Sequence, residues 1–179
     1  RDLAVSMGAR GVLVSVGTSS VSVFGTRADG SPWRAGLRDP NGAPTVVSGV
    51  VELPVGDMAS LSTSGDNLGP MGSVRAGAAP DPVSVPASDP HARETSRETP
   101  GGGGRIFDHH IIDPRTGYPA HAGVRQVSVV ASSGVLAEAL STALLVDPSI
   151  DVPDVVARWA RVTGAPASAK VVGLVRAAR

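Results

Sequence analysis

The densest group of potentially reactive side chains in this sequence lies at residues 107–119, which read FDHHIIDPRTGYP. Part of the segment has a local explanation, because Asp113, Pro114 and Gly117 are residue types that build a sharp turn. In such a turn the aspartate carboxylate accepts backbone N–H groups one or two residues further on. The turn does not require Thr116 or the two histidines. A histidine pair is more often structural than catalytic, so these residues alone leave their chemistry open.

A second candidate group lies further along the chain, where Glu138 and Thr142 are four residues apart. In a helix this spacing places both side chains on one face. A carboxylate and a hydroxyl stacked in this way can offer two hard oxygen ligands to Mg²⁺. The alternative is an exposed glutamate beside a threonine whose hydroxyl bonds to its own helix. As an isolated pair, the two residues favour the alternative.

The third candidate group is the sequence STSGD at residues 62–66. Hydroxyl groups and backbone N–H groups in a loop of this composition can cradle an anion. An ordinary hydroxyl-rich turn has the same composition, so the signal is weak by itself. We expect the strand pattern that precedes it to break at this point.

The elements that must position these groups are short strands and two later helices. Alternation of apolar with small or polar residues predicts a hairpin around Gly17 and further strands. We expect strands at residues 11–16, 20–25, 33–38, 46–53, 58–63, 126–131 and 170–176. The strands flanking Gly17, the strand after Trp33 and the strand from Gln126 are expected to share one mostly antiparallel sheet.

The helices are predicted from apolar spacing and from capping residues. Leu136, Leu140 and Leu144 form one apolar face of a helix over residues 134–146. A second helix is expected over residues 152–163, with Asp151 as its N-cap. Several antiparallel strands with segregated helices indicate an α+β fold.

Composition restricts the class of protein further. The chain has 179 residues, enough for one domain, and its 16 basic and 16 acidic residues balance. This balance gives no reason to expect nucleic acid or an anionic membrane as a partner. Cysteine is absent, which excludes disulfides and thiolate metal sites. No apolar run is long enough for a transmembrane segment, and residues 75–104, rich in Pro, Ala, Gly and Ser, are expected to be a disordered insertion.

Taken in order, six blocks of this sequence resemble one family. The blocks are GVLVSVGTSSVSVFG, DGSPWRAGLRDP, LSTSGD, HHIIDPRTGYPA, VSVVA and LAEALSTALLV. They are similar in order and spacing to the C-terminal half of the FAD:protein FMN transferases, the ApbE family, from about residue 11 to residue 146. The resemblance implies a mostly antiparallel sheet with packed helices, as a partial ApbE-like (T-fold-like) domain.

The resemblance also implies an activity, the Mg²⁺-dependent transfer of FMN from FAD to a threonine hydroxyl of a target protein with release of AMP. FAD and a target protein that bears the acceptor threonine are the implied partners. Carried over residue by residue, His110 would be the general base, with Asp113 beside it in the catalytic turn. The metal ligands would be Glu138, Ser141 and Thr142. The residues near the flavin and its phosphates would be Ile112, Thr116, Gly117, Ser64, Gly65 and Asp66.

This sequence departs from the family pattern at two places. The family has Asp where this chain has Glu138, and the family's N-terminal half, with a GGIAKG-like segment that supplies another metal ligand and FAD contacts, does not occur here. We therefore expect these 179 residues to be a fragment or a truncation that is inactive alone. Two alternatives stand beside the enzyme: a non-catalytic remnant that binds flavin or a protein, and a metal-binding module at His109, His110 and Asp113. The sequence leaves the compartment open, although family members are often exported and membrane-anchored.

Overall fold

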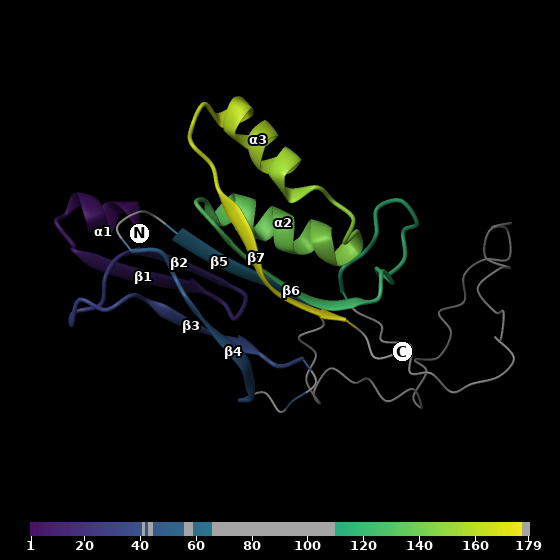
Figure 1. The fold of residues 1–179 in the computed structure, drawn as a ribbon, viewed down its shortest axis with the longest axis horizontal. Helices are drawn as coiled ribbons and strands as arrows, with labels where there is room; N and C mark the ends of the chain where they lie inside the picture. Colours follow the sequence, from purple (N-terminus) through teal and green to yellow (C-terminus); the bar gives the residue numbers. More distant parts are fainter. Residues whose placement is uncertain (41, 43–44, 56–58, 66–109, 177–179) are drawn as a thin grey trace, which may run out of the picture.

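The computed structural model describes residues 1–40, 42, 45–55, 59–65 and 110–176 (Figure 1). The expected insertion at 75–104 lies outside this part, as do His109 and Asp66. The described elements follow one another along the chain as α1 (Asp2–Ser6), β1 (Gly11–Val16), β2 (Ser20–Gly25), β3 (Arg34–Arg38), β4 (Val47–Glu52), β5 (Ala59–Gly65), β6 (Val124–Ala131), α2 (Gly134–Val146), α3 (Val152–Thr163) and β7 (Ala169–Arg176).

The larger sheet has five strands in the order β1-β2-β5-β6-β7, and every neighbouring pair is antiparallel. The β1–β2 hairpin turns at Gly17, which has a φ of 63°. Its bounds confirm the predicted hairpin. In the β2–β5 pair, Ser20 lies opposite Ser62 and Ser22 lies opposite Ser60.

The prediction that the strand after Trp33 joins this sheet is wrong. That strand is β3, which pairs with β4 in a separate two-stranded sheet. The small sheet packs on one face of the large one, because Leu37 and Leu53 share a buried cluster with Val23 of β2. Burial of these side chains therefore favours stacking of two sheets over extension of one.

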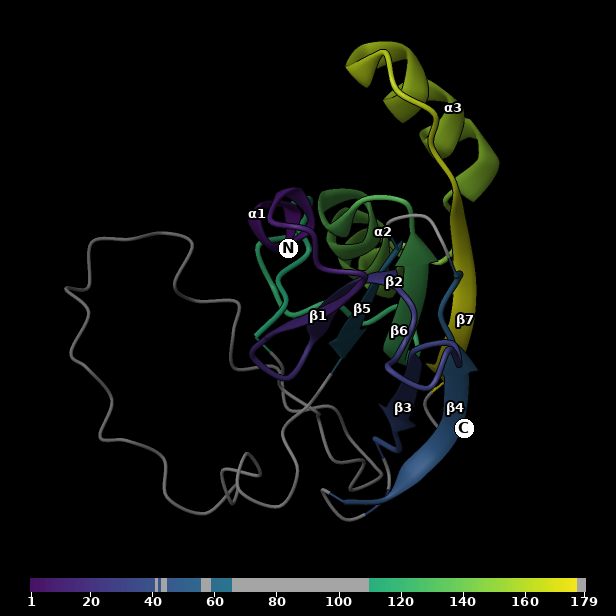
Figure 2. The same cartoon turned by 90° about the vertical axis from the view of Figure 1, so that its left-hand side faces the viewer.

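Helix α2 covers the opposite face of the large sheet, so the chain forms layers of helix, sheet and small sheet (Figure 2). Leu136, Leu140 and Leu144 are only 1%, 1% and 4% exposed, as their spacing predicts. They pack against Val127 and Val129 of β6. Each buried leucine contributes roughly 1.5–3 kcal/mol of transfer free energy, so α2 is firmly anchored to the sheet.

Helix α3 confirms the predicted second helix. The Asp151 carboxylate accepts a hydrogen bond from the Asp154 amide at 3.2 Å, and the helix ends at Gly164, whose φ is 67°. Its apolar residues, including Trp159, pack at the margin of the α2 core. The α+β fold class is thus confirmed. In the part of the chain that the structure describes, none of the helices has the length and apolar character needed to cross a membrane.

Candidate functional site

The face of the large sheet beneath α2 is divided between apolar and hydroxyl side chains. On β6 it presents Val127, Val129 and Ala131, all buried. On β2 and β5 it presents serines, because side chains alternate along a strand and the residues between them face the other core. We define the serine face as Ser20, Ser22, Ser60, Ser62 and Ser64.

Two serine pairs connect β2 to β5 across this face. The hydroxyl oxygens of Ser22 and Ser60 are 2.8 Å apart, and those of Ser20 and Ser62 are 3.5 Å apart. Ser60 and Ser62 are each 1% exposed. A buried hydroxyl needs a hydrogen-bond partner, and at these positions the opposite strand supplies one.

Glu138 reaches from α2 to the second of these pairs. Ser20 Oγ donates to Glu138 Oε2 at 2.8 Å, and Ser62 Oγ donates to the same oxygen. The glutamate nevertheless remains exposed on the surface of α2. Its carboxylate is therefore a solvent-accessible group held from one side by two hydroxyls.

Thr142 lies one turn further along α2 and contacts the last serine of the face. Ser64 Oγ lies 2.9 Å from Thr142 Oγ1 and 2.8 Å from Ser141 Oγ. Ser141 Oγ lies 3.3 Å from Ser62 Oγ and donates to the Glu138 carbonyl at 3.1 Å. A continuous chain of hydroxyls thus joins the side chains of Glu138 and Thr142.

The three predicted metal ligands differ in their surroundings. Glu138 is exposed and Thr142 is half-buried, so both can contact a cation at the surface. Ser141 is fully buried and its hydroxyl is enclosed by Ser62 and Ser64. The accessible donors are hard oxygens, which fit Mg²⁺, a cation that commonly binds one or two carboxylates together with substrate phosphates. Within the described ranges, no three histidine, aspartate or glutamate side chains gather as a ready-made metal cluster.

The interpretation of residues 62–66 as a loop or turn is wrong for the first four of these residues, although the first two also fall within the strand predicted at residues 58–63. Ser62 to Gly65 are the last residues of β5 and pair with β6. The local reason is burial, because Ser64 is 7% exposed and contacts α2. Gly65 lies so close to β6 that a Cβ atom there would be 2.7 Å from the Arg125 carbonyl oxygen. The hydroxyls of Ser62 and Ser64 therefore face α2 and do not form an anion-cradling loop.

The segment after residue 109 forms the predicted turn at Asp113. Ile112 and Pro119 form an isolated bridge, and the Asp113 amide donates to the Tyr118 carbonyl at 2.8 Å. The Gly117 amide donates to the Asp113 carbonyl at 2.8 Å, with a φ of 74° at Gly117. The local explanation of this turn is therefore confirmed.

Thr116 also takes part in this turn, which the sequence did not indicate. Its hydroxyl oxygen accepts a hydrogen bond from the Tyr118 amide at 3.2 Å. Its hydroxyl group also lies 3.4 Å from the Asp113 carbonyl oxygen. The side chain is exposed, so this local role leaves one side of Thr116 open to solvent.

Arg115 fixes the Asp113 carboxylate and connects the turn to α2. Its Nε and Nη2 donate to Asp113 at 3.0 and 2.9 Å, and its backbone amide donates at 2.9 Å. The guanidinium group, and then the amide, hold the pKa of Asp113 below its ordinary value. Nη1 of Arg115 donates to Asp147 at the C-terminal end of α2, at 3.1 Å. The pKa of Asp147 is lowered as well, first by the Ser149 hydroxyl and amide and then by Arg115.

The turn and the Glu138 group lie at different levels of the same helix. Asp147 is nine residues beyond Glu138, which corresponds to roughly 13 Å along a helix axis. His110 and Ile112 are exposed at the start of the turn. Among the described residues, no hydrogen bond joins His110 or Thr116 to Glu138. The convergence of these residues on one pocket remains a prediction.

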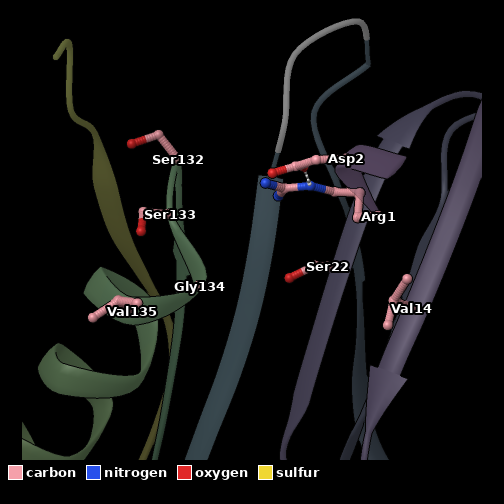
Figure 3. A pocket seen from close by; sticks show the side chains of 8 residues that line it. All are labelled: Arg1, Asp2, Val14, Ser22, Ser132, Ser133, Gly134 and Val135. Atoms are coloured by element: carbon pink, nitrogen blue, oxygen red, sulfur yellow. Dashed lines mark hydrogen bonds and ion pairs between the residues drawn. The ribbon is translucent and has the colours of Figure 1, made fainter. Parts of the chain in front are cut away.

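A cleft of about 520 Å³ lies at the opposite, N-terminal end of α2 (Figure 3). Ser132, Ser133, Gly134 and Val135 line one side of it, and Arg1, Asp2, Val14 and Ser22 line the other. None of the predicted site residues contributes to this lining.

Sequence reasoning missed the serine face, although a signal for it exists. Serine alternates with apolar residues in SVSVFG and again in ASLSTSG. This period of two places the serines of each strand on one side of a sheet. The pattern identifies a hydroxyl face but does not show that Glu138 lies above it, because that contact spans 76 residues from Ser62.

Comparisons with known proteins agree with this fold. The sequence matches the family model described as "ApbE family" over residues 1–75 and 72–164, and the chain belongs to this family. It is 43% identical over 67 residues to the FAD:protein FMN transferase of Treponema pallidum, a match covering 34% of this chain and 18% of that protein.

Two solved structures are similar in fold. The ApbE protein of Thermotoga maritima has a TM-score of 0.56 and 26% identity, with 98% of this chain and 46% of that one covered. A mutant of the flavin transferase ApbE from Vibrio cholerae has a TM-score of 0.52 at 22% identity, covering 99% of this chain and 45% of its own. This chain therefore spans about half the length of these structures.

Proposed function

We propose that this chain is part of an FAD:protein FMN transferase that uses Mg²⁺. Such an enzyme joins a threonine Oγ of a target protein to the phosphorus of the FMN half of FAD. The bond from that phosphorus to the bridging oxygen breaks, AMP leaves, and the threonine proton passes to a base. The observation that carries the proposal is the presentation of Glu138 and Thr142 side by side on α2 above the serine face.

Glu138 and Thr142 are the residues that would hold the cation. Bound there, Mg²⁺ would neutralise charge on the diphosphate of FAD. Ser141 has a different role in this proposal, because its hydroxyl is enclosed between Ser62 and Ser64. It supports the ligand side chains from behind and does not itself contact the cation.

The turn at residues 110–119 supplies the remaining chemistry. His110, exposed at its start, is proposed to take the proton from the acceptor hydroxyl, the role of a general base. Asp113 is committed to Arg115 and holds the shape of the turn. Ile112, Thr116 and Gly117 are proposed to contact FAD. On the sheet side we propose contacts from Ser64 and Gly65 at the end of β5 and from Asp66, the next residue in the sequence.

We also infer that these 179 residues do not catalyse the transfer alone. Among the described residues, the site exposes one carboxylate and one hydroxyl donor near each other. Mg²⁺ requires near-octahedral coordination, which these two ligands do not complete. The matched structures are about twice as long as this chain, so we propose that the segment outside these residues supplies further ligands.

The proposed function is tested by flavin transfer. The protein at its full natural length is incubated with FAD, MgCl₂ and total protein of its source organism, and flavin fluorescence is recorded after denaturing electrophoresis. A fluorescent band that disappears with EDTA, and that carries an FMN mass on threonine, is the expected result. Absence of any covalent flavin in the presence of Mg²⁺ would overturn the proposal. A parallel reaction with the 179-residue polypeptide is expected to give no band.

A further inference from the structure

Two serine pairs on the serine face have equivalent positions in the sheet but different contacts with α2. Ser20–Ser62 and Ser22–Ser60 both join β2 to β5 at directly opposed positions. Their β5 members are equally buried, at 1% exposure. Only the first pair contacts Glu138, through both of its hydroxyls.

The contact constrains a side chain that would otherwise be mobile. An exposed glutamate loses considerable rotamer freedom when it is fixed in one orientation. Both serine bonds fall on Oε2 of Glu138, and within the described part of the chain Oε1 has no protein donor. The pair thus holds one carboxylate oxygen against the sheet and leaves the other available to another ligand.

We propose that Ser62, assisted by Ser20, is a positioning residue that orients the Glu138 carboxylate for a divalent cation. This inference rests on the proposed function, because it takes Glu138 as a cation ligand. Groups that hydrogen-bond to a metal ligand fix its orientation and raise the affinity of the site. Neither serine touches the cation in this arrangement.

The same hydroxyl chain couples the two ligands. From Ser62 the contacts continue through Ser141 and Ser64 to the hydroxyl of Thr142. The orientation of Glu138 is therefore linked to that of Thr142 through buried hydroxyl groups. Loss of Ser62 should affect both ligands, whereas loss of Ser60 should affect neither.

Comparing Ser62→Ala with Ser60→Ala tests the positioning role. Affinity for Mn²⁺, a probe for the Mg²⁺ site, is measured by electron paramagnetic resonance on the protein at its full natural length, with FAD present. Ser62→Ala should weaken Mn²⁺ binding by roughly 10- to 100-fold, the usual effect of removing a group behind a ligand. Ser60→Ala removes an equally buried hydroxyl and should leave the affinity unchanged. Equal losses in the two variants would overturn the inference.

A double-mutant cycle separates positioning from general damage to the sheet. If Ser62 acts mainly through Glu138, Ser62→Ala should weaken Mn²⁺ binding less in the Glu138→Ala background than in the natural protein, where both ligands are present. Additive losses would contradict a role through Glu138. Should Ser62→Ala fold poorly by circular dichroism, Ser20→Ala serves in its place, with Ser20→Thr expected to restore affinity because it keeps the hydroxyl.

The same measurements distinguish the proposed cation site from the positioning role of Ser62. If Glu138→Ala leaves Mn²⁺ affinity unchanged, the proposed cation site itself is wrong and the positioning role falls with it. If Glu138→Ala weakens binding and neither Ser62→Ala nor Ser20→Ala does, the proposed site stands and the positioning inference is overturned.

Discussion

Arg115 donates a hydrogen bond from Nη1 to Oδ2 of Asp147 at 3.1 Å, which ties the turn at residues 110–119 to the C-terminal end of α2. The same guanidinium group binds Asp113 within the turn. One side chain therefore connects the turn that begins at His110 to the helix that carries Glu138. This connection explains how a segment distant in sequence from α2 is held beside it.

Removal of this side chain should loosen the turn without unfolding the sheet. Arg115→Ala is expected to accelerate hydrogen exchange of the Gly117 amide, because the hydrogen bond from this amide to the Asp113 carbonyl closes the turn. Arg115 is 62% exposed, and exposed ion pairs contribute little to global stability. Hydrogen exchange measured by NMR tests this, with Arg158→Ala on α3 as a matched control that removes another exposed ion pair. Equal protection of Gly117 in both variants would contradict the assigned role.

Acid should remove the contribution that the Asp113 carboxylate makes to the stability of the fold. The pKa of its carboxyl is lowered by Arg115 in the folded chain, so the contact stabilises the fold above the unfolded pKa of about 3.9 and is lost as pH falls through the lower, folded value. The difference in urea midpoint between the natural protein and Asp113→Asn should be constant near neutral pH. It should shrink below a pH of about 4. A difference that grows with acidity would show that the sign is wrong.

The buried face of α2 should dominate the stability of the fold. Leu140 is 1% exposed within the main core, so Leu140→Ala should lower the free energy of unfolding by about 2–5 kcal/mol. Val162 on α3 is 86% exposed, and Val162→Ala should change it by less than about 0.5 kcal/mol. Urea denaturation monitored by circular dichroism measures both. Similar costs at the two positions would mean that α2 is not the anchor of the sheet.

Local patterns in the sequence predicted the elements well. The apolar spacing of Leu136, Leu140 and Leu144 identified both α2 and its buried face, because a helix repeats every 3.6 residues. The hairpin at Gly17 was equally clear, since alternation and a turn glycine coincide there. In both elements the pattern of buried side chains follows from the repeat of the helix or strand itself, so residues close in sequence are enough to predict it.

Contacts between distant segments could not be predicted in the same way. Alternation shows which face of β3 is buried but not which strand lies beside it, so its sheet was misassigned. The cluster of small hydroxyl residues at 62–66 predicts a break in the strand pattern at Ser62 and Ser64, and the structure instead continues the strand. Their partners, Glu138 and Thr142, follow more than 70 residues later. The turn residues and the Glu138 group were predicted together from a resemblance alone, and their common pocket still awaits a test.

The most informative test of mechanism compares His110→Ala with Glu138→Ala in the protein at its full natural length. Loss of His110 removes the proposed proton acceptor, so FMN transfer should fall by roughly 10²–10⁴-fold while Mn²⁺ affinity is retained. Loss of Glu138 removes an anionic ligand, so Mn²⁺ affinity should fall first and excess Mg²⁺ should partly restore the rate.

Glu138→Asp keeps the charge but shortens the side chain by one methylene. Because it restores the residue of the family pattern, it should bind the cation at least as tightly. Rates are read from flavin fluorescence of the target protein after denaturing electrophoresis, at increasing MgCl₂. Rescue of His110→Ala by Mg²⁺, or transfer that is indifferent to both substitutions, would remove these residues from their assigned roles.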